Sequence, residues 1–132
     1  MTDGELRTLC HRYFDAIERR DVQTVAALYA PEFTFWINLT GKEQSREENL
    51  ETLAQGYALH RRRTYDDRTI HTFATGFVVQ YSVNVVEHGG RRTSLWACVV
   101  ARCHAGRITR IEEYLDSIHF RAPRPAEPEV AR

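Results

Sequence analysis

Residues 77–115 read FVVQYSVNVVEHGGRRTSLWACVVARCHAGRITRIEEYL, and this stretch determines the architecture of the chain. Apolar and polar side chains alternate along it, which is the period of β-strands with one buried face. The alternation is interrupted at His88-Gly89-Gly90 and at Ala105-Gly106, two sequences typical of tight turns. Residues 65–75 alternate in the same way and meet the next strand at Gly76. The sequence therefore predicts an antiparallel meander whose strands cover residues 65–75, 77–87, 93–103 and 107–115.

Upstream of the meander, apolar residues recur every three or four positions, which is the period of a helix. Thr2 or Asp3 can cap a helix over residues 3–20. Its buried stripe would consist of Leu6, Leu9, Cys10, Tyr13, Phe14 and Ile17. A shorter helix follows, capped by Asp21 and ended by Pro31, because a proline cannot continue a helix.

The residues between the second helix and the meander predict one strand and a third helix. Residues 33–38 are rich in aromatic side chains and alternate, and Thr40-Gly41 ends this strand. Ser45 with Glu48 three positions on is a capping-box pattern, and the helix that it begins extends to about His60. Helices followed by a meander predict an α+β domain with helices packed on one face of a sheet.

The chain has 132 residues, which is enough for one domain with one hydrophobic core. We place that domain at residues 1–120 and expect a flexible C-terminal tail at residues 121–132, where prolines stand among charges and alanines. Lys plus Arg equals Asp plus Glu, at 18 each, so no net charge would recruit nucleic acid or an anionic membrane surface.

The cysteine pattern favours a reducing compartment. Cys10, Cys98 and Cys103 are odd in number and not closely paired, which argues against a disulfide framework and fits the cytoplasm. No Cys or His spacing typical of zinc sites occurs, so no metal is expected. The polar N-terminus is not a signal peptide, and no apolar run approaches the roughly 20 residues that cross a bilayer.

A run of basic residues leaves two interpretations open. Arg61, Arg62 and Arg63 are consecutive, and Arg91 and Arg92 follow nearby. The first interpretation is a solvated turn with basic flanks. The second is a site for a ligand that carries a phosphate or a carboxylate.

The order of helix, helix, strand, helix and long meander resembles the nuclear transport factor 2-like superfamily, which includes ketosteroid isomerase and the SnoaL-like cyclases. Arg12-Tyr13-Phe14, Arg20-Asp21 and residues 27–34 (ALYAPEFT) are similar to its opening helices and first strand. Residues 106–116 (GRITRIEEYLD) are similar to its closing strand. The resemblance covers roughly residues 5–118 and implies a cone-shaped α+β barrel, in which three N-terminal helices and a curved, mostly antiparallel sheet enclose a pocket. It does not specify a reaction, because this superfamily hosts isomerases, dehydratases, cyclases, epoxide hydrolases and binding proteins.

Only part of the ketosteroid isomerase site has a counterpart in this chain. The opening helix resembles that of the isomerase without a gap, which places Tyr13 where a tyrosine donates a hydrogen bond to the developing enolate. The alternative is that Tyr13 is an aromatic of the buried stripe. The isomerase has an Asp base where this chain has Trp36-Ile37-Asn38. Val99 stands in the place of its second oxyanion donor, so we do not expect the steroid isomerase mechanism.

A different carboxylate, Glu113, is the predicted acid–base group. It stands where the resemblance to SnoaL-like cyclases and to limonene-1,2-epoxide hydrolase implies a pocket carboxylate. Alternation puts Glu113 on one strand face with Ile111 and Leu115, and burial there should raise its pKa, which suits proton transfer near neutral pH. The alternative is a register slip that exposes Glu113 and buries Tyr114. The expected pocket lining consists of Trp36, Tyr81, Val99, Ile111 and Leu115.

Asn38 and His71 are further candidates. Trp36 and Asn38 have the spacing of the aromatic and the Asn that hold water in limonene-1,2-epoxide hydrolase. The Arg-x-Asp of that enzyme has no counterpart in residues 79–83, so Glu113 would act alone. His71 resembles the catalytic His of scytalone dehydratase-like proteins, and alternation could point it inward. The alternative is a structural or exposed histidine.

Three functions remain open. The first is a cofactor-independent isomerase, dehydratase or cyclase acting on a small hydrophobic carbonyl compound of polyketide, terpenoid or steroid type. Glu113 or His71 would move the proton, and Tyr13 would stabilise the enolate. The second is an epoxide hydrolase-like enzyme with Glu113 as base and Asn38 orienting water. The third is a non-catalytic domain that binds a small molecule or serves as a scaffold.

The predicted outer face of the sheet indicates a homodimer. Trp96, Cys98 and Val100 alternate on that face, and bulky apolar groups of this kind need cover from water. Related domains commonly pair through this face, which the resemblance implies for this chain as well.

Overall fold

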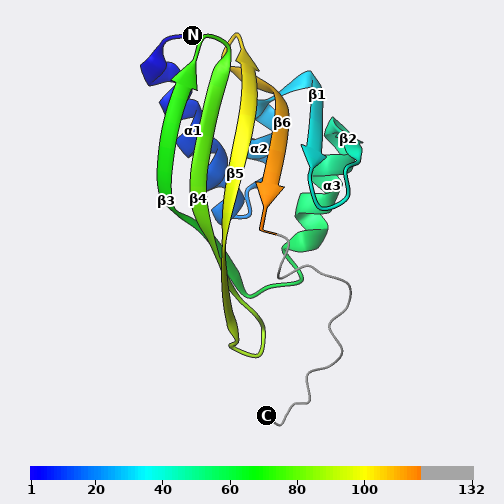
Figure 1. The fold of residues 1–132 in the computed structure, drawn as a ribbon. Helices are drawn as coiled ribbons and strands as arrows, with labels where there is room; N and C mark the ends of the chain where they lie inside the picture. Colours follow the sequence, from blue (N-terminus) through cyan, green and yellow to red (C-terminus); the bar gives the residue numbers. More distant parts are fainter. Residues whose placement is uncertain (117–132) are drawn as a thin grey trace.

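The computed structural model describes residues 1–116, which form three helices and one six-stranded sheet (Figure 1). The helices are α1 (Asp3–Glu18), α2 (Val22–Leu28) and α3 (Arg46–Gly56). The strands are β1 (Tyr29–Ile37), β2 (Glu43–Ser45), β3 (Arg62–Phe73), β4 (Gly76–Val86), β5 (Arg92–His104) and β6 (Arg107–Leu115). The predicted α+β class is confirmed. The predicted tail, residues 121–132, lies outside the described residues.

Side-chain caps fix where the helices begin. The Glu5 amide donates to the Thr2 hydroxyl, and the Thr2 amide donates to the Glu5 carboxylate, so α1 starts with a capping box. Ser45 and Glu48 form the same reciprocal pair at the start of α3, as the sequence predicts. The Asp21 carboxylate accepts a hydrogen bond from a backbone amide in the first turn of α2.

All three helices end earlier than predicted, α1 by two residues at Glu18. α2 ends before Pro31, because Tyr29 already begins β1. Tyr29 is fully buried and stacks on Phe33 with the ring centroids 3.6 Å apart, so extended backbone there buries two aromatic rings. α3 ends at Gly56 rather than near His60, since glycine is a weak helix former.

The sheet has the strand order β2-β1-β6-β5-β4-β3. Strands β3, β4, β5 and β6 form the predicted antiparallel meander. β1 pairs with β6 in parallel, so the first strand of the chain lies beside the last and the sheet is mixed. The sequence did not predict the short β2, which pairs with β1. Arg110 on β6 anchors it by donating two 2.9 Å hydrogen bonds to the Glu43 carboxylate.

A bulge in β3 changes which of its side chains face the core. The register with β4 shifts between Asp66 and Thr69, and Asp67 has a positive φ of 56°. An irregularity of this kind moves the later side chains to the opposite face. Tyr65 before the bulge and Ile70 after it are therefore both buried, although an odd number of positions separates them.

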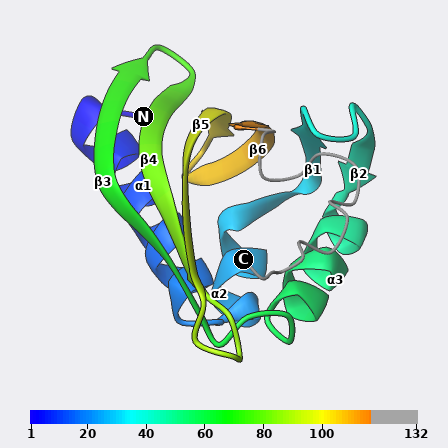
Figure 2. The same cartoon turned by 60° about the horizontal axis from the view of Figure 1, so that its bottom comes forward.

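The helices cover one face of the sheet and leave the other open. α1 packs on β3 and β4, and α3 packs on β1 and β2 (Figure 1, Figure 2). The core between these layers includes Phe14, Tyr29, Phe33, Phe77 and Tyr81. We call the helix-covered side of the sheet the inner face and the other side the outer face. Within residues 1–116, the model has no helix long and apolar enough to cross a membrane.

Candidate functional site

Glu113 brings a carboxyl group to the inner face. In β6 it lies between the buried Ile111 and the partly buried Leu115, and its register partner on β5 is the buried Val99. Tyr114 is 43% exposed, so the strand has the predicted register and not the slipped alternative. Glu113 itself is half-buried, which leaves part of its side chain within reach of a ligand.

Burial raises the pKa of the Glu113 carboxyl above its ordinary value of 4.5. The Tyr81 hydroxyl donates a 2.7 Å hydrogen bond to Oε2, and this bond and the charge of Arg63 both lower the pKa. Burial outweighs both effects. The ionised carboxylate loses more stabilisation with its hydration than the Tyr81 hydrogen bond and the Arg63 charge supply. Such a carboxyl can accept and return a proton closer to neutral pH than an exposed glutamate.

Buried tyrosines from α1, β1, β3 and β4 lie within electrostatic range of this carboxyl. They are Tyr13, Tyr29, Tyr65 and Tyr81. Burial raises the pKa of each hydroxyl, and the negative charge of Glu113 raises it further. The pKa of Tyr65 rises to about 12. All of these hydroxyls therefore stay neutral hydrogen-bond donors at physiological pH.

The proton of Tyr13 is already engaged in this arrangement. The Tyr29 hydroxyl donates its single proton to Asn49 Oδ1 at 2.6 Å, since an amide oxygen only accepts. Tyr13 must therefore donate to the Tyr29 oxygen, which is 3.3 Å away. Asn49 is buried and donates in turn to Gln44 Oε1 at 3.1 Å. Tyr13 would have to turn from Tyr29 to serve as the predicted enolate donor.

Most of the predicted site residues come together on the inner face. These are Tyr13, Tyr81, Val99, Ile111, Glu113 and Leu115. They come from α1, β4, β5 and β6, elements that the sequence predicts from regular periodicity. Where the alternation is unbroken, it is sufficient to predict the direction in which a side chain points.

Trp36 and His71 do not join this group. Trp36 pairs in register with Glu112, and its ring contacts Tyr114 with the centroids 5.3 Å apart, which places it on the outer face. His71 is exposed, because it follows the bulge in β3. The inward orientation that the sequence predicts for these two side chains is therefore wrong.

Asn38 joins β1 to β6. Its Nδ2 donates to the Leu115 carbonyl at 3.1 Å, and its Oδ1 accepts from the Leu115 amide at 3.0 Å. Its main-chain amide donates to the Glu113 carbonyl at 3.0 Å. The side-chain amide thus extends the strand pairing beyond the end of β1. It is hydrogen-bonded to the backbone of Leu115 and not to the Glu113 carboxyl.

The sequence patterns do not single out Tyr57 or Asn49 as site residues, and they name Arg63 only within a run of basic residues that could bind a phosphate or a carboxylate. Arg63 and Tyr65 are two positions apart in β3, before the bulge, so they share the inner face. The charge of Arg63 acts on the pKa of Tyr57, Tyr65 and Glu113, which places it at this site. The alternation of Arg63 with Tyr65 indicates that the two side chains share a strand face. The run of three arginines does not by itself distinguish Arg63 from Arg61 and Arg62.

Partly buried apolar side chains of β1, of β6, and of α3 and the residue that follows it pack against the same core. They are Ile37, Leu50, Leu53, Tyr57 and Leu115. Ile37 is the register partner of Glu113 on β1, and Leu115 follows Glu113 in β6. This apolar rim offers contact area to a hydrophobic molecule that approaches the carboxyl.

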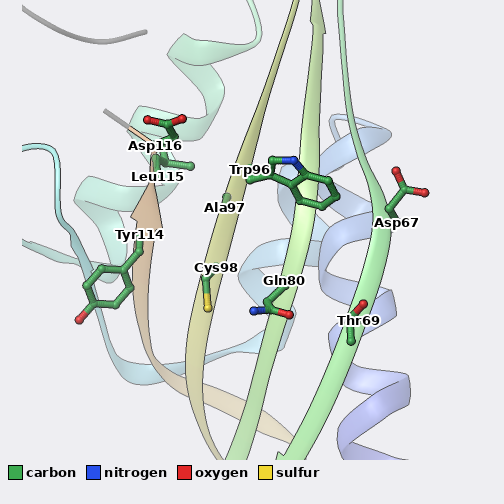
Figure 3. Close-up of a pocket in the computed structure, with 9 residues that line it drawn as sticks. All are labelled: Asp67, Thr69, Gln80, Trp96, Ala97, Cys98, Tyr114, Leu115 and Asp116. Carbon is green, nitrogen blue, oxygen red and sulfur yellow. The ribbon is translucent and has the colours of Figure 1, made fainter. Parts of the chain in front are cut away.

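A separate hollow of about 700 Å³ lies on the outer face (Figure 3). Its lining includes Asp67, Gln80, Trp96, Cys98 and Tyr114, and the Trp96 indole extends from β5 over β4. These side chains come from the face opposite to the Glu113 carboxyl. The hollow therefore lies on the other side of the sheet, although it shares Leu115 with the inner-face site.

Within residues 1–116, no three His, Cys, Asp or Glu side chains gather in a way that could hold a metal ion. Cys10, Cys98 and Cys103 are free. Burial raises the pKa of Cys10 and of Cys103 to about 12, so these two stay protonated and unreactive at neutral pH.

The SnoaL-like domain family matches residues 10–111. A candidate polyketide cyclase of Xanthomonas campestris is 19% identical with a TM-score of 0.80, over 89% of this chain and 94% of that one. The candidate hydroxylase AclR of Streptomyces galilaeus is 14% identical with a TM-score of 0.79, over 89% and 92%. TerC, co-crystallised with polyporic acid, is 15% identical with a TM-score of 0.77, over 88% and 95%. No curated protein matches in sequence. At these identities the likeness shows the fold alone.

Proposed function

This chain belongs to the SnoaL-like domain family, and from that premise we propose that it is an acid–base enzyme acting on a small hydrophobic carbonyl compound of polyketide, terpenoid or steroid type. The family match and the fold confirm the predicted resemblance. The observation that carries the proposal is the Glu113 carboxyl, which the inner face holds with a raised pKa and a tyrosine donor. A fold shared with candidate polyketide cyclases supports this class of substrate.

In the proposed reaction, Glu113 acts first as a base. Its carboxylate takes a proton from the carbon next to the substrate carbonyl, the C–H electron pair forms a C=C bond, and the carbonyl π pair moves to oxygen to give an enolate. Protonated Glu113 then returns the proton. Return to another carbon gives an isomer, return to a departing hydroxyl gives water and an alkene, and return to an alkoxide completes a cyclisation. Tyr81 orients the carboxyl through Oε2.

Deuterium incorporation tests this function with a simple probe. The hydrophobic ketone 2-tetralone is incubated with the protein in D2O, and the loss of its α-proton signals is followed by NMR. We expect the wild-type protein to accelerate the exchange and Glu113→Gln to lower the rate at least about 100-fold. Glu112→Gln is the matched control, since Glu112 is the neighbouring glutamate on the opposite strand face and should leave the rate unchanged.

The other outcomes distinguish the alternatives. Equal exchange rates in the wild type and in Glu113→Gln contradict the proposal. A ketone that binds both proteins without exchange favours a binding or scaffold domain. An epoxide converted to a diol that carries oxygen-18 from solvent water favours the epoxide hydrolase. The engagement of the Asn38 amide by Leu115 gives that last alternative less support.

We also propose that two copies of the chain pair through the outer face and that the protein works in the cytoplasm. Trp96 is 62% exposed and Tyr114 43% exposed on that face, which are large aromatic surfaces to leave in water. Cys98 and Val100 extend the same surface along β5. The free cysteines support a reducing compartment.

A further inference from the structure

We propose that Arg63 and the Tyr57 hydroxyl form a binding site for an anionic oxygen of the substrate, a carboxylate or the enolate of the reaction. This inference rests on the function proposed above and names the group that would hold the substrate opposite Glu113. The substrate that this site would bind is a hydrophobic carbonyl compound with an oxygen that is negatively charged or becomes so during the reaction.

Arg63 lacks the carboxylate partner that comparable arginines have. Arg46, Arg63, Arg68 and Arg110 are the half-buried arginines of residues 1–116. The ion pairs of this group are Arg46 with Glu47, Arg68 with Asp15 and Glu18, and Arg110 with Glu43 and Glu112. Arg63 forms no ion pair with any residue of that part of the chain. Arg63 donates a hydrogen bond to its neighbour Tyr65, which is neutral and so carries no charge to compensate that of the guanidinium.

This pair contributes two of the unsatisfied buried side-chain atoms of residues 1–116, and Arg46 Nε and His60 Nδ1 are the others. Arg63 Nε and the Tyr57 hydroxyl have no hydrogen-bond partner among residues 1–116. A buried donor without an acceptor costs free energy, so it indicates an unfilled place for an acceptor. Both residues are half-buried as a whole, which leaves the rest of each side chain within reach of a ligand. An anionic oxygen would satisfy both donors and the unpaired charge together.

The position of this pair relative to Glu113 suits one bound substrate. β4 and β5 separate Arg63 on β3 from Glu113 on β6. The Arg63 charge nevertheless lowers the pKa of Glu113, so the two side chains are within electrostatic range across the inner face. Tyr57 follows α3 and belongs to the apolar rim, and the Arg63 charge acts on the pKa of its hydroxyl as well.

The charge changes of the proposed reaction fit this placement. As Glu113 takes the proton it becomes neutral, while the substrate oxygen becomes negative. A fixed guanidinium and a hydroxyl aimed at that oxygen stabilise the enolate more than the ketone. This would give Arg63 and Tyr57 the role that the resemblance implies for Tyr13, whose proton is directed at Tyr29.

A binding experiment tests the site without turnover. The probes are 2-naphthoate and its neutral methyl ester, titrated into the protein and followed by fluorescence. We expect the wild type to bind the acid more tightly than the ester. Arg63→Gln should weaken naphthoate at least about tenfold and leave ester binding unchanged. Arg62→Gln is the matched control, since Arg62 is the exposed neighbour on the other face of β3.

Two further variants separate charge from packing. Arg63→Lys keeps the positive charge and should retain more naphthoate affinity than Arg63→Gln. Tyr57→Phe removes one donor and should weaken naphthoate several-fold, and this measurement decides the proposal if Arg63→Gln does not fold. Circular dichroism and thermal unfolding establish that each variant is folded.

The proposal is overturned if Arg63→Gln binds naphthoate as tightly as the wild type, or if the wild type does not prefer the acid to the ester. Glu113→Gln should bind naphthoate no more weakly than the wild type, because it removes a negative charge near the site. Intact naphthoate binding with no ketone exchange in the wild type would therefore reject the proposed function alone. Exchange that depends on Glu113 without any Arg63 effect would reject the oxygen site alone.

Discussion

Tyr81 lowers the proton affinity that burial gives to Glu113. It is fully buried on β4, and its 2.7 Å hydrogen bond offsets part of the effect of burial on the pKa of the carboxyl. Its ring also packs against Phe14 and Tyr65, with centroid distances of 4.8 and 5.6 Å. Tyr81→Phe therefore removes the donor and keeps the packing. We expect the pKa of Glu113 to rise further, and the pH midpoint of deuterium exchange to move upward. An unchanged pH profile would show that this bond does not favour the ionised carboxylate.

Glu113 should also make the stability of the fold depend on pH. Because its pKa is raised above 4.5, the folded state binds the proton more tightly than the unfolded chain. The stability that this supplies is fully present below about pH 4.5 and is lost as the pH rises through the folded-state pKa. Glu113→Gln cannot titrate. Its free energy of unfolding relative to the wild type should therefore increase between about pH 4 and pH 7, as measured by urea unfolding. A difference that stays constant over this range would contradict the raised pKa.

Single positions in the interior were predictable where their strand is regular. β6 alternates regularly from Ile111 to Leu115, after its register shift between Ile108 and Arg110, so the inward direction of Glu113 follows from its two neighbours on that face. Asn49 shows the limit of this reasoning. It is a polar residue in a helix with little amphipathic pattern, and it is buried because Tyr29 donates to it from β1. Such a contact depends on tertiary packing, which no local pattern contains.

Among the elements, β3 shows why His71 was misplaced. Its bulge lies at Asp66-Asp67-Arg68-Thr69, a stretch without the glycine that usually marks a positive φ. Arg68 stabilises this irregular stretch by bonding Tyr65 O at 2.8 Å and Asp15 on α1 at 2.9 Å. The helix that supplies one of these contacts is remote in sequence, so alternation alone could not reveal the change of face.

Gly76, where β4 begins, is a strict requirement of the sheet. A Cβ atom there would lie 1.8 Å from the Ala101 carbonyl oxygen and 2.9 Å from the Phe73 ring. Gly76→Ala must therefore push β4 and β5 apart, and we expect it to lower the free energy of unfolding by about 1–3 kcal/mol. Denaturant unfolding measures this change.

The control for this prediction is Gly56→Ala at the end of α3. A Cβ atom at Gly56 would have no heavy-atom neighbour within 4 Å. We expect this variant to be as stable as the wild type or more stable by about 0.4–1 kcal/mol, because alanine restricts the unfolded chain. Equal stability of Gly76→Ala and Gly56→Ala would contradict the close approach of the two strands.

For the molecule as a whole, the α+β arrangement was predictable and the edge of the sheet was not. Periodicity predicts three helices followed by a meander, and both are present. The parallel pairing of β1 with β6 joins Trp36 to Glu112, and β2 depends on the bond between Arg110 and Glu43. These contacts link segments that are far apart in the chain. Local patterns do not specify which distant strands pair.

The outer face leads to a prediction about assembly. We expect the wild-type protein to have the mass of a dimer in light scattering at micromolar concentration, and Trp96→Glu to have the mass of a monomer, because a charge would replace an aromatic anchor. Leu59→Glu is the matched control, since Leu59 is 68% exposed and lies between α3 and β3 rather than on a strand of the sheet. It should remain a dimer. A monomeric wild type would contradict pairing through the outer face.

The proton affinity of Glu113 is the property on which the proposed enzyme depends, and NMR can measure it in the free protein. The side-chain carboxyl carbons of glutamate are labelled with carbon-13 and titrated, and the resonance missing in Glu113→Gln identifies the residue. We predict a midpoint above the ordinary value of 4.5, as burial on the inner face requires. A midpoint at or below 4.5 would show a solvated or strongly paired carboxylate, and the inner face would then lack the base that the proposed reaction needs.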